Sequence, residues 1–465
     1  MIRDFLGKHE KKGTVSFHMP GHKGAALYED LGYKDFLQGF LNWDVTEIPG
    51  ADNLFQTEGI IEETAERYAR LYHVDKSYLL INGTSGGLIA AIMASVPKGK
   101  KLLMARNCHK SVFNALILAG IEPVYVYPEA GEVAGPVPPE EIERLLAEEP
   151  EIEAVLLPSP NYYGICSDLQ AIEKVTHEAG KVLIVDQAHG AHLHFFHEFG
   201  QGEGMPLSAE ACGADIVVNS IHKTLASMTQ SALLNLQGER VCPYHLEDKL
   251  QMIQSTSPSY VLMASLDINR DILENHGKEL FAGWRRELEA FYEEAKGIEG
   301  LRLLRGADMD FTKINMDMGI PGEALEKLLM EKGVYTELYT GNILMAMSGL
   351  GNRPEDYRRL LDGLRSIGED SSIGNRRWDS EQKVDSSFIK REVFAIPQGK
   401  EYVSLKDAPG RICAVSVIPY PPGIPHICPG EKFSPEDIGY IEKLRSAGEK
   451  VIGVNELGQV LVGCV

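Results

Sequence analysis

The sequence YLLINGTSGGLIAAIMASV, residues 78–96, predicts a strand, a glycine-rich turn and a helix in direct succession. The apolar run Tyr78–Ile81 has the length of a strand, and the longer apolar run Leu88–Val96 is typical of a helix. Between them, residues 82–87 are rich in glycine and small polar residues, as turns are. The first amides of a helix that begins at such a turn favour a bound anion. This stretch therefore predicts one unit of an α/β sheet with a phosphate site at its edge.

The alternation of strands and helices continues on both sides of this unit. A helical face precedes it from about residue 57, and further apolar runs predict strands at 101–105, 123–127, 154–158, 182–185, 216–219 and 231–236. Helices are predicted between them at 111–119, 140–148 and 169–179. Gly120 and Gly180 stand where helix C-caps belong. Strands that alternate with helices predict the α/β class, with a mainly parallel sheet and helices on both faces.

Three regions are expected along the chain. Residues 1–56 form an N-terminal arm, residues 57–300 a large domain that ends in a long helix from about Val261 to Gly297, and residues 301–465 a C-terminal α+β region. Residues 366–387 are polar and poor in aliphatic side chains, which predicts a surface connection. The prolines in Tyr420–Pro425 exclude a regular helix or central strand there.

Composition limits the functional class. The chain has 465 residues and a formal net charge of −21 at pH 7, which argues against binding a nucleic-acid backbone. Its seven cysteines are odd in number and not closely paired, as is usual in a reducing compartment. Charges from Arg3 and Asp4 onward and the absence of a long apolar stretch predict neither a signal peptide nor a membrane span. We expect a cytoplasmic protein that acts on a small molecule.

A lysine and an aspartate each follow a predicted strand. Asp186 ends the run 182–185, and Lys223 lies in residues 220–224, just after the strand 216–219. Ligands of open parallel sheets bind outside the carboxyl ends of the strands, so both side chains are expected at one edge. A pyridoxal-phosphate (PLP) enzyme needs an amine to hold the cofactor as a Schiff base and a carboxylate to keep its ring nitrogen protonated. We therefore predict PLP, with Lys223 and Asp186 in these roles.

The residues around this pair are suited to the rest of such a cofactor. Thr84, Ser85 and Gly86, at the predicted helix start, suit a phosphate dianion. Ser220 and His222, next to the lysine, are candidates for further phosphate hydrogen bonds.

His109 begins the helix after the strand 101–105 and is a candidate to stack on the cofactor ring, although a lone histidine is more often a structural hydrogen-bonding group. Histidines also cluster at 189, 192, 194 and 197. They follow a strand and a glycine, and no carboxylate or cysteine ligand set accompanies them, so we predict no metal site.

Together these residues resemble the Orn/Lys/Arg decarboxylase family, fold-type I PLP enzymes with the aspartate-aminotransferase fold. The resemblance covers nearly the whole chain, and it rests on residues 18–23 (HMPGHK), 82–86, 106–111, 159–164, 186–192, 220–225, 255–260, 420–425 and 429–431. It implies Lys223 as the Schiff-base lysine and Asp186 at the pyridine nitrogen. It also implies His109 on one ring face, Ala188 under the ring, and His189 in the cofactor site. Thr84, Ser85, Ser220 and His222 would lie around the phosphate.

The resemblance also implies an oligomer and a substrate class. Cofactor sites of this family lie at a dimer interface, so Ser257 is expected to reach the phosphate of the partner subunit, in a homodimer or a higher even oligomer. Glu431 is a candidate acceptor for the distal cation of the substrate, and an equally good reading makes it a carboxylate near the N-terminus of the helix that follows. Gln187 stands where the family often has Glu.

The resemblance implies PLP-dependent decarboxylation of a basic L-amino acid. The motifs begin near residue 17, which leaves no room for an N-terminal receiver-like wing, so the chain resembles the shorter arginine decarboxylases of polyamine biosynthesis. Arginine, giving agmatine and carbon dioxide, is the first choice, and lysine and ornithine stay open because the sequence does not reveal pocket length. A fold-type I aminotransferase or aldolase is the alternative of another class. An inactive regulatory paralogue is disfavoured because Lys223, Asp186 and the phosphate turn are all present.

Overall fold

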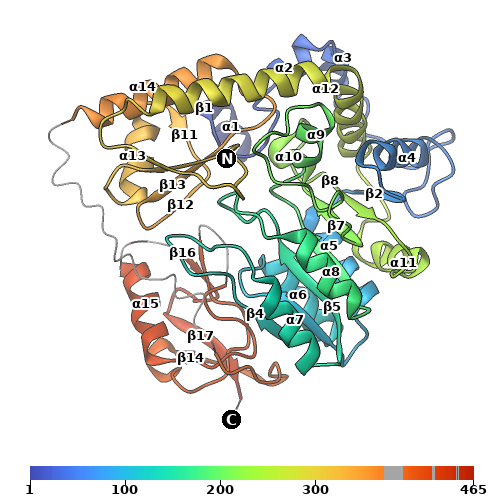
Figure 1. Ribbon diagram of the computed structural model, residues 1–465, viewed down its shortest axis with the longest axis vertical. Coiled ribbons are helices and arrows are strands. Elements are labelled where there is room, and N and C mark those ends of the chain that lie inside the picture. The colour runs from blue at the N-terminus through green and yellow to red at the C-terminus, as the bar shows by residue number, and fades with distance from the viewer. Residues whose placement is uncertain (371–390, 421–424, 447, 449, 465) are drawn as a thin grey trace.

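The computed structural model describes residues 1–370, 391–420, 425–446, 448 and 450–464. At its centre is a seven-stranded sheet with the strand order β2-β8-β7-β6-β5-β3-β4 (Figure 1). The strands are β2 (Lys76–Leu80), β3 (Lys101–Ala105), β4 (Glu122–Val126), β5 (Ile152–Pro158), β6 (Val182–Asp186), β7 (Ile216–Asn219) and β8 (Ala232–Leu236). Strand β8 runs antiparallel to both of its neighbours, β2 and β7, and all other neighbouring pairs in this sheet are parallel. The predicted mainly parallel α/β sheet is confirmed.

Two groups of helices cover the sheet. In one, α5 (Gly83–Ser95) packs against α6 (Lys110–Ala119) and α11 (Pro243–Ile253). In the other, α7 (Pro139–Glu148) packs against α8 (Leu169–Glu178) (Figure 1). Every residue of β6 and β7 is buried, as expected for parallel strands covered on both faces. The continuous apolar runs in the sequence are the direct cause of this burial.

A second sheet is formed by strands that follow the long helix α12 (Tyr260–Ala295) in the sequence, and it is antiparallel (Figure 1). Its order is β12 (Leu338–Thr340), β13 (Ile343–Met347), β10 (Lys313–Asp317) and β9 (Arg302–Leu304). The helices of this region are α13 (Gly322–Glu331) and α14 (Pro354–Gly368), and α14 packs along α12. The predicted polar connection at 366–387 begins inside α14, and its residues 371–387 lie outside the described residues.

The N-terminal segment is built into this second region. Its helices are α1 (Ile2–Glu10), α2 (Ala26–Asp30) and α3 (Lys34–Gly39), and they are followed after a loop by α4 (Ile60–Tyr72). Its short strand β1 (Val15–Ser16) pairs in parallel with β11 (Val334–Tyr335). This pairing brings the start of the chain beside residues more than 300 positions later.

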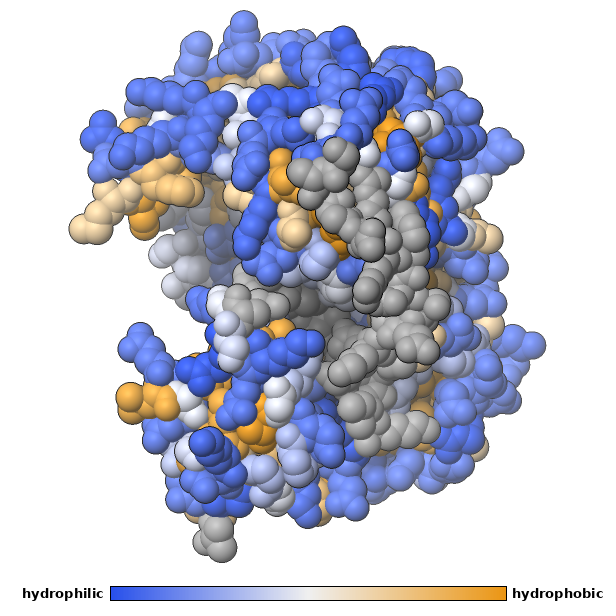
Figure 2. All heavy atoms as spheres, turned by 90° about the vertical axis from the view of Figure 1, so that its left-hand side faces the viewer, coloured by the Kyte–Doolittle hydropathy of each residue, from blue (hydrophilic) through white to orange (hydrophobic). Residues whose placement is uncertain are grey.

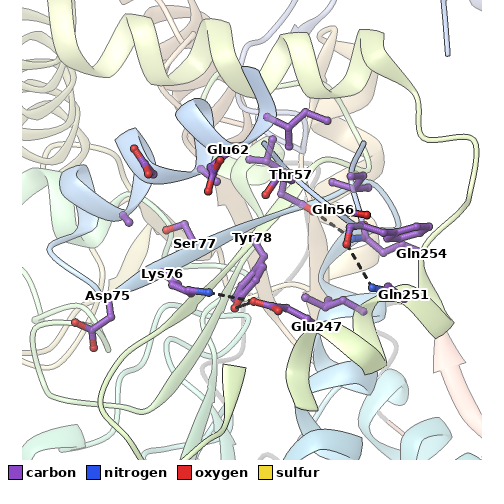
Figure 3. Close-up of a pocket in the computed structure, with 18 residues that line it drawn as sticks. Gln56, Thr57, Glu62, Asp75, Lys76, Ser77, Tyr78, Glu247, Gln251 and Gln254 are labelled. Atoms are coloured by element: carbon purple, nitrogen blue, oxygen red, sulfur yellow. Dashed lines mark hydrogen bonds and ion pairs between the residues drawn. The ribbon is translucent and has the colours of Figure 1, made fainter. Parts of the chain in front are cut away.

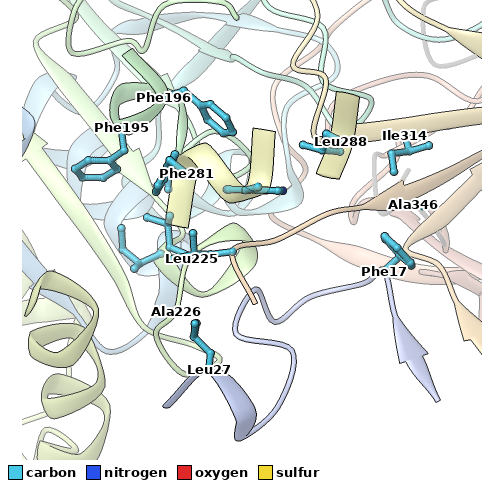
Figure 4. Close-up of a cluster of buried hydrophobic side chains, with 14 of the residues drawn as sticks. Phe17, Leu27, Phe195, Phe196, Leu225, Ala226, Phe281, Leu288, Ile314 and Ala346 are labelled. Atoms are coloured by element: carbon cyan, nitrogen blue, oxygen red, sulfur yellow. The ribbon is translucent and has the colours of Figure 1, made fainter. Parts of the chain in front are cut away.

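One hydrophobic core joins these parts. Phe17 and Leu27 of the N-terminal segment belong to the same buried cluster as Phe196 of α9 (Leu193–Glu198), Phe281 of α12 and Ile314 of β10 (Figure 4). Burying each large apolar side chain contributes about 1.5–3 kcal/mol to folding. Because α9 follows β6 directly, this core also fixes the loop that carries Asp186 and His189.

The C-terminal residues form a small unit with a core of their own. Strand β14 (Lys400–Ser404) pairs with β17 (Gln459–Gly463), and β15 (Ile418–Tyr420) pairs with β16 (Lys450–Ile452). A short 3-10 turn, η2 (Leu405–Asp407), and helix α15 (Pro435–Ser446) complete it (Figure 1). Of the proline-rich segment Tyr420–Pro425, residues 421–424 lie outside the described residues.

The face in Figure 2 is mostly hydrophilic, and its hydrophobic side chains lie in small separate groups. Within the described part of the chain, no helix combines the length and the apolar character needed to cross a membrane.

Candidate active site

A pocket lies at the carboxyl ends of β5, β6 and β7, where the strand order predicts ligands to bind. The volume that water molecules can enter in this pocket is about 40 Å³. Its lining contains six of the predicted site residues, namely Thr84, His109, Asp186, Ala188, His189 and Lys223. The remaining lining residues come from the loop after β5 and the end of that strand, namely Pro158, Pro160, Asn161 and Tyr162.

Lys223 projects into this pocket from α10 (Ile221–Thr224), the single helical turn that follows β7. Its Nζ lies 2.9 Å from Nε2 of His189. Burial lowers the pKa of Lys223, and the charge of Asp186 opposes part of this effect. The amine therefore loses its proton more readily than an exposed lysine, which is the property that a nucleophilic lysine needs.

Asp186 is the last residue of β6, and it shares the pocket with Lys223. Its Oδ1 accepts a hydrogen bond from the Ala188 amide at 3.1 Å. Burial raises the pKa of this carboxyl group, and the nearby Lys223 cation lowers it. A carboxylate in such a site is stabilised by a cation placed against it.

Two neutral histidines form walls of the pocket. His109 caps the N-terminus of α6, where its Nδ1 accepts the Ser111 amide hydrogen at 3.3 Å. Burial and the charge of Lys223 lower the pKa of His109 to about 3, so its ring is uncharged at neutral pH. The His189 ring packs edge-on against Tyr162, with centroids 4.8 Å apart.

The predicted phosphate residues lie beside the pocket. Helix α5 begins at Gly83, whose φ of +67° is in the left-handed region, and its N-cap residue Asn82 makes no side-chain capping bond. The first amides of α5 are therefore not capped by the Asn82 side chain. Of the predicted phosphate residues only Thr84 lines the pocket, while Ser85 and His222 are next to lining residues in the sequence, and Gly86 and Ser220 are close in sequence to them but not adjacent.

His222 is held in place by its backbone surroundings. Its Nδ1 lies 2.9 Å from the Ser231 carbonyl oxygen and 3.1 Å from the Ser220 hydroxyl. Burial lowers the pKa of His222 to about 4. Because a neutral Nδ1–H can donate to the Ser231 carbonyl, Nε2 then remains as an acceptor.

A buried network of Lys313, Asp310 and His192 holds the backbone of His189. Lys313 donates from Nζ to the His189 carbonyl oxygen at 2.9 Å and pairs with Asp310 Oδ2 at 2.7 Å. The same oxygen of Asp310 lies 3.0 Å from Nε2 of His192. The neighbouring His192 and Lys313 hold the pKa of Asp310 well below its usual range. Sequence reasoning missed Lys313, Asp310 and Tyr162, because the first two belong to the second sheet region, far along the chain.

The N-terminal HMPGHK motif packs against the turn that carries Lys223. The Gly21 amide donates to the His222 carbonyl at 2.7 Å. A Cβ at Gly21 would lie 2.4 Å from the Leu225 carbonyl oxygen, so no larger residue fits there. Lys23 donates to the Met347 carbonyl at 3.2 Å, and burial lowers its pKa to about 7. The motif therefore ties the Lys223 turn to the second sheet.

Glu431 and Ser257 lie outside the pocket lining. Glu431 is fully buried and forms a bidentate ion pair with Arg106, with Nε–Oε1 and Nη2–Oε2 distances of 2.8 Å each. Its Oε2 also accepts the Cys428 amide hydrogen at 2.8 Å. The structure thus places the predicted substrate acceptor in a contact between the C-terminal unit and the loop after β3. Ser257 is exposed, in the segment that precedes α12.

A larger cavity lies elsewhere, between α4, β2 and α11 (Figure 3). Its lysine, Lys76, pairs with Glu247 at 3.1 Å, and the same carboxylate oxygen accepts the Tyr78 hydroxyl at 2.9 Å. Among its lining residues, Glu62 and Asp75 add further acidic groups. No free amine faces a buried carboxylate among these lining residues, so this cavity does not combine the groups found around Lys223.

The mainly parallel sheet with helices on both faces is the fold of fold-type I PLP enzymes. The model of "Orn/Lys/Arg decarboxylase, major domain" matches residues 2–300, and that of the family's C-terminal domain matches residues 389–457. The chain belongs to the Orn/Lys/Arg decarboxylase family, and it is an amino-acid decarboxylase.

Individual relatives agree with this family. The chain is 34% identical to an uncharacterised protein of Bacillus subtilis (strain 168), YaaO, over 96% of this chain and 95% of that one. It is 32% identical to an arginine decarboxylase of the same organism, over 96% and 94% of the two chains. The solved structure of the Escherichia coli constitutive lysine decarboxylase superposes with a TM-score of 0.78 at 21% identity, over 99% of this chain and 81% of that one. That superposition shows a shared fold.

Proposed function

We propose that this chain is a PLP-dependent arginine decarboxylase that forms agmatine and carbon dioxide. The observation that carries the proposal is the pocket that the half-buried Lys223 amine and the buried Asp186 carboxylate line together, at the carboxyl ends of adjacent strands. Similarity supports the choice of arginine. Relatives named arginine decarboxylase are 30–32% identical to this chain, and those named lysine decarboxylase are 23–25% identical.

The residues around the pocket fit PLP group by group. The uncapped start of α5 offers amides and the Thr84 hydroxyl to a phosphate dianion. The buried Asp186 suits a protonated ring nitrogen, because burial disfavours its charge until a cation is placed against it. His109 is uncharged and Ala188 is small, so the two offer surfaces for a flat aromatic ring. Lys223 supplies the amine.

PLP, when bound, supplies an electron sink for the electrons that remain on the α-carbon as carbon dioxide leaves. Lys223 has a lowered pKa, so its Nζ is available as a nucleophile and can afterwards hold a proton for return to the α-carbon. His189, 2.9 Å from Nζ, is the nearest side chain able to exchange that proton. Tyr162 and His189 pack together at the wall of the pocket.

The substrate's guanidinium requires a carboxylate, and the candidate we favour is Glu337, which like Glu431 is not among the lining residues of the pocket. Glu337 is half-buried, its Oε2 accepts the Met19 amide hydrogen at 2.9 Å, and its charge raises the pKa of Lys223. Glu431, the acceptor expected from the sequence, has both carboxylate oxygens bound to Arg106. A Glu431 contact with substrate would require that pair to open.

The proposal includes a homodimer or a higher even oligomer, in which Ser257 contributes to the phosphate site of the partner subunit. Ser257 is exposed and lies outside the lining of its own chain's pocket, so a role at that pocket would have to come from another copy. Sedimentation of the PLP-loaded protein tests this part. A monomer with full activity would contradict it.

The substrate assignment is tested by incubating the purified protein and PLP with equal concentrations of arginine, lysine and ornithine, and identifying the amines by mass. We expect agmatine to form at the highest rate. If cadaverine or putrescine were the main product, the substrate would be lysine or ornithine and not arginine. Amino transfer to a 2-oxo acid without carbon dioxide release would place the chain among aminotransferases.

A further inference from the structure

A group of metal-ligating side chains lies away from the Lys223 pocket. His73 follows α4 as its C-cap residue, and His194 and Glu198 lie one turn apart on α9. One potential ligand atom from each residue lies within 4.8 Å of the other two. The His73 Nε2 and Glu198 Oε2 atoms are 3.7 Å apart, which is longer than a hydrogen bond. The donor atoms therefore surround a small space without bonding one another.

His194 provides the second observation. The residue is 92% buried, and its Nε2 has no hydrogen-bond partner. The ring has a backbone hydrogen bond with Leu71, which must use Nδ1 because Nε2 is unpaired. A histidine with Nδ1–H donated to a carbonyl keeps its lone pair on Nε2, and this is the arrangement found behind metal-bound histidines. An unpaired nitrogen in a buried position otherwise costs stability.

Another histidine of this chain, His177, also lies among carboxylates, but both of its ring nitrogens are paired. His177 lies 2.5 Å from Glu173 through Nδ1 and 2.8 Å from Asp215 through Nε2. Both ring nitrogens of His177 thus have carboxylate partners, so no lone pair is left to bind an ion. His194 is also close to a carboxylate, yet its Nε2 stays free.

We propose that His73, His194 and Glu198 bind a divalent transition-metal cation of the zinc class, with water as the fourth ligand. Two imidazoles and one carboxylate are a common zinc ligand set, with metal–ligand bonds of about 2.0–2.2 Å. Donor atoms of a tetrahedral site are then about 3.4 Å apart. His73 and Glu198 have side chains that are 63% and 40% exposed, so they can rotate to close the remaining distance around the buried His194.

The ion would join the end of α4 to α9. Strand β2 and the phosphate turn follow α4, and α9 follows the loop that carries Asp186 and His189. The site would therefore connect the two segments that lead into the pocket. We assign it a stabilising role, because none of its three ligands lines the pocket around Lys223.

The test uses chelator-treated, PLP-loaded protein in equilibrium dialysis against buffered Zn²⁺, with thermal unfolding measured in parallel. Wild type should bind one Zn²⁺ at this site and melt about 3 °C higher when free Zn²⁺ is a hundred times Kd. His73→Ala and Glu198→Gln should each weaken binding about tenfold or more. Both side chains are exposed, so these variants should fold, and unfolding without Zn²⁺ checks that they do.

The matched control is His245→Ala, which removes an exposed histidine of α11. It should bind Zn²⁺ as wild type does. Equal binding by wild type, His73→Ala and Glu198→Gln would overturn the proposal, because the ion would then sit elsewhere on the chain. Wild type that neither binds Zn²⁺ nor gains thermal stability would overturn it as well.

Discussion

The Arg106–Glu431 ion pair gives the sharpest prediction about how the C-terminal unit is held. Arg106 and Glu431 are both fully buried, and Arg106 also donates to the carbonyl oxygens of Pro425 at 2.8 Å and His426 at 3.1 Å. Glu431→Gln leaves the guanidinium buried beside a neutral partner. Removing one partner of a buried ion pair costs about 3–5 kcal/mol. Because unfolding entropy is about 1 kcal/mol per degree for a chain of this size, the melting temperature should fall by at least about 3 °C.

A double-mutant cycle separates the pair from its surroundings. Arg106→Met and Glu431→Met should each destabilise the protein by a similar amount, and the double variant Arg106→Met/Glu431→Met should cost clearly less than the sum of these two single changes. The assay is thermal and urea unfolding, with arginine kinetics measured at 25 °C on the folded variants. We expect KM of Glu431→Gln to stay within about twofold of wild type. An unchanged melting temperature together with a KM raised tenfold or more would refute this reasoning and make Glu431 the substrate acceptor.

Two further perturbations follow from the buried charges. The folded-state pKa values of His109 and His222, about 3 and 4, lie below the ordinary 6.5, so the unfolded chain binds more protons between these values. Stability is therefore highest above pH 6.5, and the free energy of unfolding of the cofactor-free protein should fall by about 2–3 kcal/mol from pH 7 to 5.5 in urea titrations. A pH-independent urea midpoint over this interval would count against neutral buried rings. Lys313→Met leaves the Asp310 carboxylate and the His189 carbonyl without their cation, and should lower the free energy of unfolding by about 3–5 kcal/mol in the same assay. A loss below 1 kcal/mol would show that the network contributes little.

The central sheet was predictable because its signal is local. Buried parallel strands require continuous apolar runs, and such a run can be recognised from neighbouring residues alone, as in 101–105 and 182–186. The presence of Asp186 and Lys223 in one pocket was predictable for the same reason, since both follow such runs and strand ends meet at one edge.

Contacts between distant segments were not predictable in this way. Lys313 reaches the His189 carbonyl from the second sheet, and no spacing rule connects residues so far apart. The buried state of Glu431 depends on Arg106, which precedes it by 325 positions, so its ion pair could not be read from the local Pro-Gly-Glu pattern. His73 likewise joins His194 and Glu198 only through the packing of α4 near α9. The sequence pattern predicted the lysine, the aspartate and the phosphate residues, the family resemblance added others such as Ala188 and Ser257, and only the folded structure revealed the supporting residues.

The most direct test of the central claim is the release of carbon dioxide from carboxyl-labelled arginine by wild type and Lys223→Ala, with PLP absorbance recorded for both. Lys223 is the only lysine among the residues that line the pocket. We predict that wild type releases label in equal amount to the agmatine formed, and that Lys223→Ala loses turnover by at least about 10³-fold and the absorbance of lysine-bound cofactor. A Lys223→Ala variant that keeps both activity and that absorbance would contradict the account.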